Sequence, residues 1–159
     1  PSFWTNKNGL GKEINMEKVL ILHGLDHDKM GKDAASPHST TMETLNSQLS
    51  AEAEVLSVRL AFYQNNDSAQ VCREITSAKA NGFQGIVFNP AAWMDSGEEI
   101  AAALSQSGLP VAEVHMSNVC KAPDSHNVIA PAVTGLVTGF GESVYTAGLR
   151  LLVEFLRRQ

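Results

Sequence analysis

The chain has 159 residues, which suits one compact domain and excludes two domains of ordinary size. Its 43% hydrophobic and 18% charged residues are typical of a soluble globular protein and argue against a disordered chain. The net charge of −5 excludes a basic nucleic-acid surface as the main feature, and no apolar run is long enough to span a membrane. We therefore expect neither nucleic acid nor a membrane as a partner.

The first fifteen residues differ in composition from the rest. They lack the positive start and apolar run of a secretion signal, so we expect an N-terminal extension or flexible arm over residues 1–15 and one domain over 16–159. The chain has two cysteines, Cys72 and Cys120, which are too few for a disulfide framework. A reducing, cytoplasmic location is the simpler expectation.

From residue 18 onward, short apolar runs alternate with helical patterns. We predict strands at 19–22, 55–63, 85–88 and 111–115, and helices at 41–53, from 67 or 68 to 79, from 96 or 97 to 104, and 132–158. Strands that alternate with helices in this way form a parallel sheet covered on both faces. We expect an α/β fold of three α/β/α layers around a flavodoxin-like, doubly wound, five-stranded parallel sheet.

The last predicted helix contains four glycines, and three of them, Gly135, Gly139 and Gly141, lie close together near its start. Each costs roughly 1 kcal/mol in a helix interior. Close packing against another helix or a second subunit would explain them.

Polar residues follow each predicted strand. They are His23 after the first, Asn66 and Asp67 after the second, Asn89 after the third, and His115 with Ser117 after the fourth. In doubly wound folds ligands bind at the carboxyl ends of the strands, so we expect a site there that includes His23.

The segment after the first strand, HGLDHDKMGKDAASPHSTT, is rich in histidine and aspartate. Such density suits a metal site, a proton-transfer site or a solvated loop. His23 and His27 are four residues apart, but Gly24 and the loop setting deny them a shared helical face, which is weak support for zinc. Neither GxGxxG nor GxxxxGK[ST] is present, so no phosphate loop is predicted, and we expect no cofactor.

Five blocks along the chain together resemble the type II 3-dehydroquinate dehydratases, a family of small flavodoxin-like dehydroquinases. In the order of the chain, with the usual family form after each, they are STTMETL at 39–45 (STTLEDI), FYQNN at 62–66 (FFQSN), FNPAAWMDSG at 88–97 (INPGAYTHTS), PVAEVHMSN at 110–118 (PVVEVHLSN) and APAVTGLVTGFG at 130–141 (SPxAxGxIxGxG).

The resemblance implies a small-molecule substrate, removal of a proton next to its ketone, and acid-assisted loss of a hydroxyl group as water. It implies that Glu113 and His115 form the general-acid pair and that Asn89 is a site asparagine. Met116 and Ser117 would hold the substrate carboxylate. It also implies a homo-oligomer, a trimer-based dodecamer in the family, in keeping with the GxxxGxG pattern in the last predicted helix.

Several family residues are replaced here. The catalytic tyrosine matches His38, the arginine that lowers its pKa matches Asp33, and the loop asparagine that helps to hold a water matches Asp26. A family histidine matches Asp95, a substrate-binding arginine falls near Asp124, and an aspartate donated across a subunit boundary matches Ala102.

The first two replacements are chemically coherent. A phenol is a poor base near neutral pH unless a cation stabilises the phenolate, whereas imidazole is already a competent base. We hypothesise that His38 replaces the tyrosine as base and that Asp33 orients its ring and stabilises the imidazolium. The alternative is drift of an exposed loop after loss of activity.

The replacements also make the expected pocket more negative. Carboxylates at positions 33, 95 and 124 favour a different or less anionic substrate, or no turnover. Two alternatives remain open: a catalytically silent oligomer that binds a ligand or partner, and a metal-dependent site built from His23, His27 and the aspartates.

Overall fold

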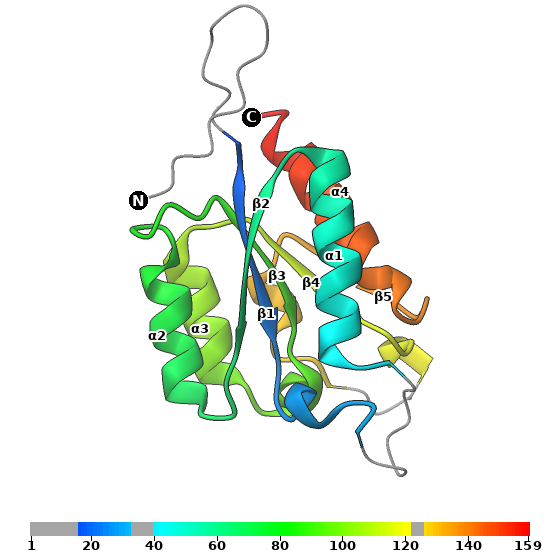
Figure 1. The fold of residues 1–159 in the computed structure, drawn as a ribbon. Helices are drawn as coiled ribbons and strands as arrows, with labels where there is room; N and C mark the ends of the chain where they lie inside the picture. The colour runs from blue at the N-terminus through cyan, green and yellow to red at the C-terminus, as the bar shows by residue number, and fades with distance from the viewer. Residues whose placement is uncertain (1–15, 33–39, 122–125) are drawn as a thin grey trace, which may run out of the picture.

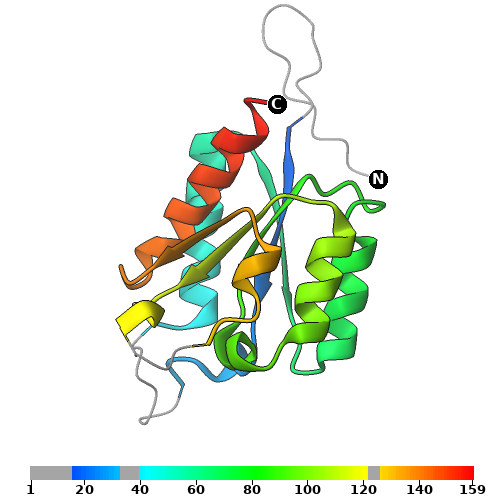
Figure 2. The ribbon, with the colours of Figure 1, turned by 180° about the vertical axis from the view of Figure 1, so that it is seen from behind.

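The computed structural model describes residues 16–32, 40–121 and 126–159. Five parallel strands form one sheet in the order β2-β1-β3-β4-β5, with two helices on each face (Figures 1 and 2). The strands are β1 Lys18–His23, β2 Arg59–Gln64, β3 Gly85–Asn89, β4 Val111–His115 and β5 Gly135–Thr138, and the helices are α1 Met42–Leu56, α2 Ser68–Ala78, α3 Glu98–Ser107 and α4 Ser143–Leu156. The predicted flavodoxin-like, five-stranded fold is confirmed.

The central strands β1, β3 and β4 are buried on both faces, which explains their nearly continuous apolar sequence. Strands β2 and β5 lie at the edges and are only partly buried. Helices α1 and α4 cover one face, and α2 and α3 cover the other.

The alternation of side chains along a strand decides which face each polar residue shares. Val19 and Ile21 pack in the core under α1 and α4, so His23, in the same phase of β1, lies on that face. Asn89 lies on the same face of β3, two residues after Val87 of that core. On β4 the phase is opposite: Val111 packs in the core under α2 and α3, and Glu113 and His115 follow it.

The predicted terminal helix over 132–158 is wrong in its first part. Residues 130–132 form a short 3₁₀ helix (η4), residues 135–138 form the edge strand β5, and the helix begins only at Ser143. Gly139 and Gly141 have φ values of +98° and +59°, so they form the turn between β5 and α4 rather than a helix.

The predicted boundary between the first helix and the second strand is also wrong. Helix α1 continues through Val55 to Leu56, and Ser57 ends it in the left-handed conformation. Strand β2 therefore starts at Arg59 rather than at Val55. The β-branched and aromatic residues of 55–63 masked this boundary.

In the described residues no helix is long and apolar enough to cross a membrane.

Candidate active site

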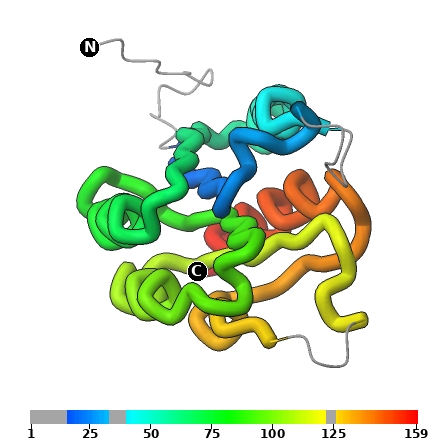
Figure 3. The backbone as a smooth tube through the Cα atoms, turned by 90° about the horizontal axis from the view of Figure 1, so that it is seen from below, coloured from blue at the N-terminus to red at the C-terminus, as the bar shows by residue number. Residues whose placement is uncertain are grey.

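The carboxyl ends of the strands face one end of the molecule, which Figure 3 shows end on. The loops after β1, β3 and β4 and the segment leading to η4 gather there. This is the edge where ligands bind in doubly wound folds.

Glu113 and His115 form a buried pair at the end of β4. The Glu113 side chain is fully buried, and its Oε1 lies 2.6 Å from Nε2 of His115. A carboxylate oxygen can only accept, so the ring donates through Nε2 and Nδ1 is the nitrogen available to a ligand. The sequence alone left open whether Glu113 contacts His115 or only faces the other side of the sheet, and the structure shows the contact.

A third residue joins this pair from a distant part of the chain. Asn127 Nδ2 donates to the same Oε1 of Glu113 at 2.7 Å. Sequence reasoning missed Asn127, because nothing local in SHNVIAP marks an asparagine that reaches β4.

Asn89 belongs to a second buried cluster on the opposite face of the sheet. Its Nδ2 donates to the Tyr145 hydroxyl at 2.9 Å, and its Oδ1 accepts from the backbone N–H of Ala91 at 3.1 Å. The Tyr145 oxygen also lies 3.1 Å from Nε2 of His27. Burial raises the pKa of Tyr145, against the opposing effect of the Asn89 hydrogen bond, so this hydroxyl stays protonated near neutral pH.

His23 is fully buried next to this cluster. Its Nε2 lies 2.7 Å from Asn46 Oδ1, and its ring centroid lies 5.7 Å from that of His27 and 5.8 Å from that of Tyr145. Burial lowers the pKa of His23 below 6.5, and the hydrogen bond to Asn46 opposes that effect. A neutral ring that donates through Nε2 suits a binding wall better than a cationic site.

The other predicted site residues that the structure describes differ in exposure. Asp26 has a left-handed backbone conformation and its carboxylate pairs with Lys29 at 2.7 Å. Asp95 ends the 3₁₀ helix Ala91–Asp95 (η2) and is exposed. Met116 is buried, whereas Ser117 is exposed.

The predicted residues Asp33, His38 and Asp124 lie outside the described residues. Within the described ranges no group of three histidines, cysteines or carboxylates is placed to hold a metal ion. Both cysteines are free.

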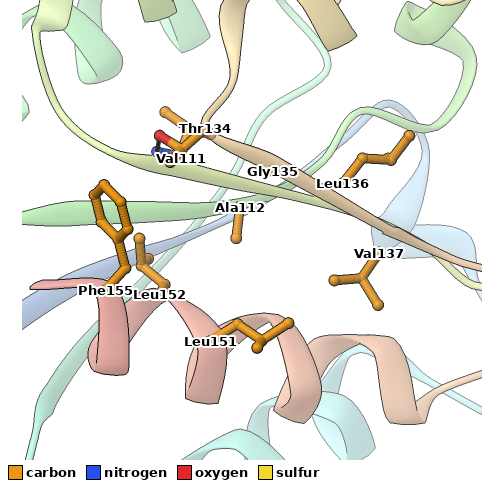
Figure 4. Close-up of a pocket in the computed structure, with 9 residues that line it drawn as sticks. All are labelled: Val111, Ala112, Thr134, Gly135, Leu136, Val137, Leu151, Leu152 and Phe155. Carbon is orange, nitrogen blue, oxygen red and sulfur yellow. Dashed lines mark hydrogen bonds between the residues drawn. The ribbon is translucent and has the colours of Figure 1, made fainter.

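An apolar groove lies away from these polar clusters, between β4, β5 and α4 (Figure 4). Its lining contains no acid or base: Val111, Ala112, Thr134, Gly135, Leu136, Val137, Leu151, Leu152 and Phe155. Such a groove suits contact with another apolar surface, and it has no group that could transfer a proton.

The profile of the family described as Dehydroquinase class II matches residues 17–153. The chain belongs to the class II dehydroquinase family. It is 35% identical to a 3-dehydroquinate dehydratase from Acaryochloris marina over 149 residues, which cover 92% of this chain and 99% of that one.

Solved type II dehydroquinases share the fold. The enzyme from Butyrivibrio crossotus superimposes with a TM-score of 0.80 at 26% identity, covering 86% of this chain and 97% of that one. The enzyme from Propionibacterium acnes gives 0.78 at 28% identity, with 87% and 98% covered. The resemblance inferred from the five sequence blocks is confirmed.

Proposed function

We propose that this class II dehydroquinase homologue is a hydro-lyase. It removes a proton α to a carbonyl and eliminates water from a cyclic hydroxy-ketone, with 3-dehydroquinate as the first substrate to test. The observation that carries the proposal is the buried Glu113–His115 pair at the carboxyl end of β4. The curated relatives named 3-dehydroquinate dehydratase support the same reaction class.

The Glu113–His115 pair supplies the acid. With Nε2 held by Glu113, protonated His115 presents its Nδ1–H to the leaving hydroxyl, which departs as water. The buried carboxylate fixes the ring orientation and stabilises the imidazolium before transfer.

His38 supplies the base in this proposal, oriented by Asp33. Its imidazole takes the α-proton to form the enol(ate), and the electrons return to expel the hydroxyl group that His115 protonates. Solvent then carries the proton from His38 back to His115, so the cycle produces an enone and water. The support is chemical. Imidazole is a competent base near neutral pH by itself, whereas a phenol needs a neighbouring cation to stabilise its phenolate.

The remaining residues bind the substrate. Met116 and Ser117 receive its carboxylate, and Asn89 and His23 support the site from the face of the sheet that α1 and α4 cover. Asp26 holds a water in the site, and Asp95 and Asp124 contact the substrate's hydroxyl groups.

The test is incubation of the purified full chain with 3-dehydroquinate, with the ultraviolet absorbance of the conjugated enone as readout. We expect turnover, and we expect Glu113→Gln, His115→Gln and His38→Ala each to lower kcat by about 10²- to 10⁴-fold, the usual share of one acid or base. A thermal unfolding transition in each variant like that of the wild type would show that the lost activity does not come from loss of the fold.

Two results would contradict parts of the proposal. Wild-type turnover that is unchanged in His38→Ala removes the base assignment and leaves the acid pair standing. Binding of dehydroquinate without turnover favours the silent, ligand-binding alternative.

We also propose that the chain forms a homo-oligomer, a trimer-based dodecamer as the family resemblance implies. The apolar groove supports a second copy as its occupant, because β5 is an edge strand whose outer side is open to pairing in the described sheet. Leu136, Leu151 and Phe155 in its lining are 38%, 56% and 41% exposed, a large apolar exposure for a lone chain.

A further inference from the structure

Two backbone N–H groups that follow Asn127 in the chain fix the orientation of its side-chain amide. Its side-chain oxygen lies 3.0 Å from the backbone nitrogens of both Ile129 and Ala130, just before and at the start of η4. Backbone N–H groups only donate, so the atom facing them is the carbonyl oxygen. The amide nitrogen must therefore point the other way.

That nitrogen points at Glu113. It lies 2.7 Å from Oε1, which also accepts from His115 Nε2 at 2.6 Å. The second oxygen, Oε2, is buried and has no hydrogen-bond partner among the residues that the structure describes. The carboxylate is therefore oriented by two donors on one oxygen, and Asn127 is one of them.

The segment carrying Asn127 is itself tied to the scaffold. The backbone N–H of Val128 donates to the carbonyl oxygen of Met94 at 2.9 Å, and Ile129 is fully buried in the core under α2 and α3. Glu113 lies on this same face of the sheet. The Asn127 amide thus contacts the Glu113 carboxylate from a packed segment. A residue that positions a catalytic group must itself be held in place.

We propose that Asn127 is a positioning residue for the acid side of the reaction. It holds the Glu113 carboxylate so that Oε1 stays aligned on His115 Nε2, and it acts through Glu113 rather than on the substrate. The inference rests on the proposed hydro-lyase function for its kinetic readout.

The decisive variant is Asn127→Asp, which keeps an oxygen for the two backbone donors and replaces the amide donor with a carboxylate oxygen. We expect kcat to fall about tenfold to a hundredfold near pH 8, as for misplacement of a catalytic group, with KM within about twofold. The difference in kcat between Asn127→Asp and wild type becomes smaller as the pH is lowered, because the introduced carboxyl group, once protonated, can again donate to Glu113. Asn127→Ala loses kcat without this recovery.

The matched control is Asn81→Asp, the same exchange at an exposed asparagine beyond the opposite edge of the sheet, between α2 and β3. It leaves kcat and its pH profile unchanged. A pH profile of Asn127→Asp that parallels wild type overturns the proposal.

A second readout separates this inference from the proposed function. We expect ¹⁵N NMR of the wild-type His115 ring to give the signal of the Nε2–H form held by Glu113. Asn127→Ala should shift that signal, and Asn81→Asp should not. If dehydroquinate is not turned over, the proposed function fails while this measurement still decides the role of Asn127. An unchanged His115 signal in Asn127→Ala overturns it.

Discussion

At the scale of single residues, His23 shows how burial sets the state of an ionisable group. Asn46 Oδ1 accepts from Nε2, so the neutral ring carries its lone pair on Nδ1, which is buried without a hydrogen-bond partner among the described residues. Protonation would place a second N–H and a charge in that environment. The lowered pKa of His23 is the result.

This lowered pKa makes folding stability depend on pH. In the unfolded chain the ring takes up a proton near its ordinary value of 6.5, whereas the folded ring resists, so below that pH the unfolded state binds more protons. The free energy of unfolding is therefore flat above about pH 6.5 for this group and falls below it, by at most about 1.4 kcal/mol per pH unit. We expect His23→Gln, which keeps a donor for Asn46, to flatten that fall in urea titrations at several pH values.

The control for this titration is His126→Gln, because His126 is exposed. It should leave the slope between about pH 5 and 6.5 unchanged. An equal slope in wild type and His23→Gln would show that other groups cause the acid sensitivity.

The sequence could predict those contacts of the site that join residues close to each other in the chain. Two residues of one strand at i and i+2 share a face, so the contact between Glu113 and His115 follows from the sequence EVH. The contacts of Asn127, Asn46 and Tyr145 join segments 14 to 118 residues apart, and no local pattern encodes them.

At the scale of elements, the sequence located β1, β3, β4 and α2 to within about a residue or two, because their apolar runs and caps are clear. It missed β5, because Leu136, Val137 and Phe140 continue the helical spacing of α4 across the turn. The glycines of this segment argued against one long helix, because glycine is unfavourable in a helix interior.

Three glycines of this region provide a graded test. An added Cβ at Gly135 meets nothing within 4 Å; at Gly141 it also has open space but a φ of +59°; at Gly139 it has a φ of +98° and would lie 2.9 Å from Asn118 Cβ. We expect alanine to cost less than about 0.5 kcal/mol at position 135, about 1 at 141 and about 2 to 3 at 139. Urea denaturation measures the series.

The order of the three alanine variants is the decisive result. Equal losses at positions 139 and 135 would contradict the turn between β5 and α4 and restore the longer helix. A loss at 141 as large as at 139 would mean that backbone strain alone, rather than contact with Asn118, sets the cost.

At the scale of the whole molecule, the sheet separates two kinds of polar cluster. Glu113, His115 and Asn127 meet on the face of α2 and α3, whereas Asn89 and His23 lie on the face of α1 and α4 with Tyr145. Both clusters reach the carboxyl edge, where a substrate can meet acid from one side and binding groups from the other. The apolar groove lies along β5 and α4 instead, so the surface proposed for contact between copies contains none of these polar residues.

This separation allows assembly to be tested without touching the site. Light scattering of wild type should give a multiple of 17.1 kDa, and Leu151→Glu should shift the mass toward one chain, because it would place a charge in the apolar contact proposed between copies. Val55→Glu, at a residue 72% exposed on α1 and outside the groove lining, is the matched control and should keep the wild-type mass. A wild-type mass of 17.1 kDa, or an unchanged mass in Leu151→Glu, would show that copies do not meet through this groove.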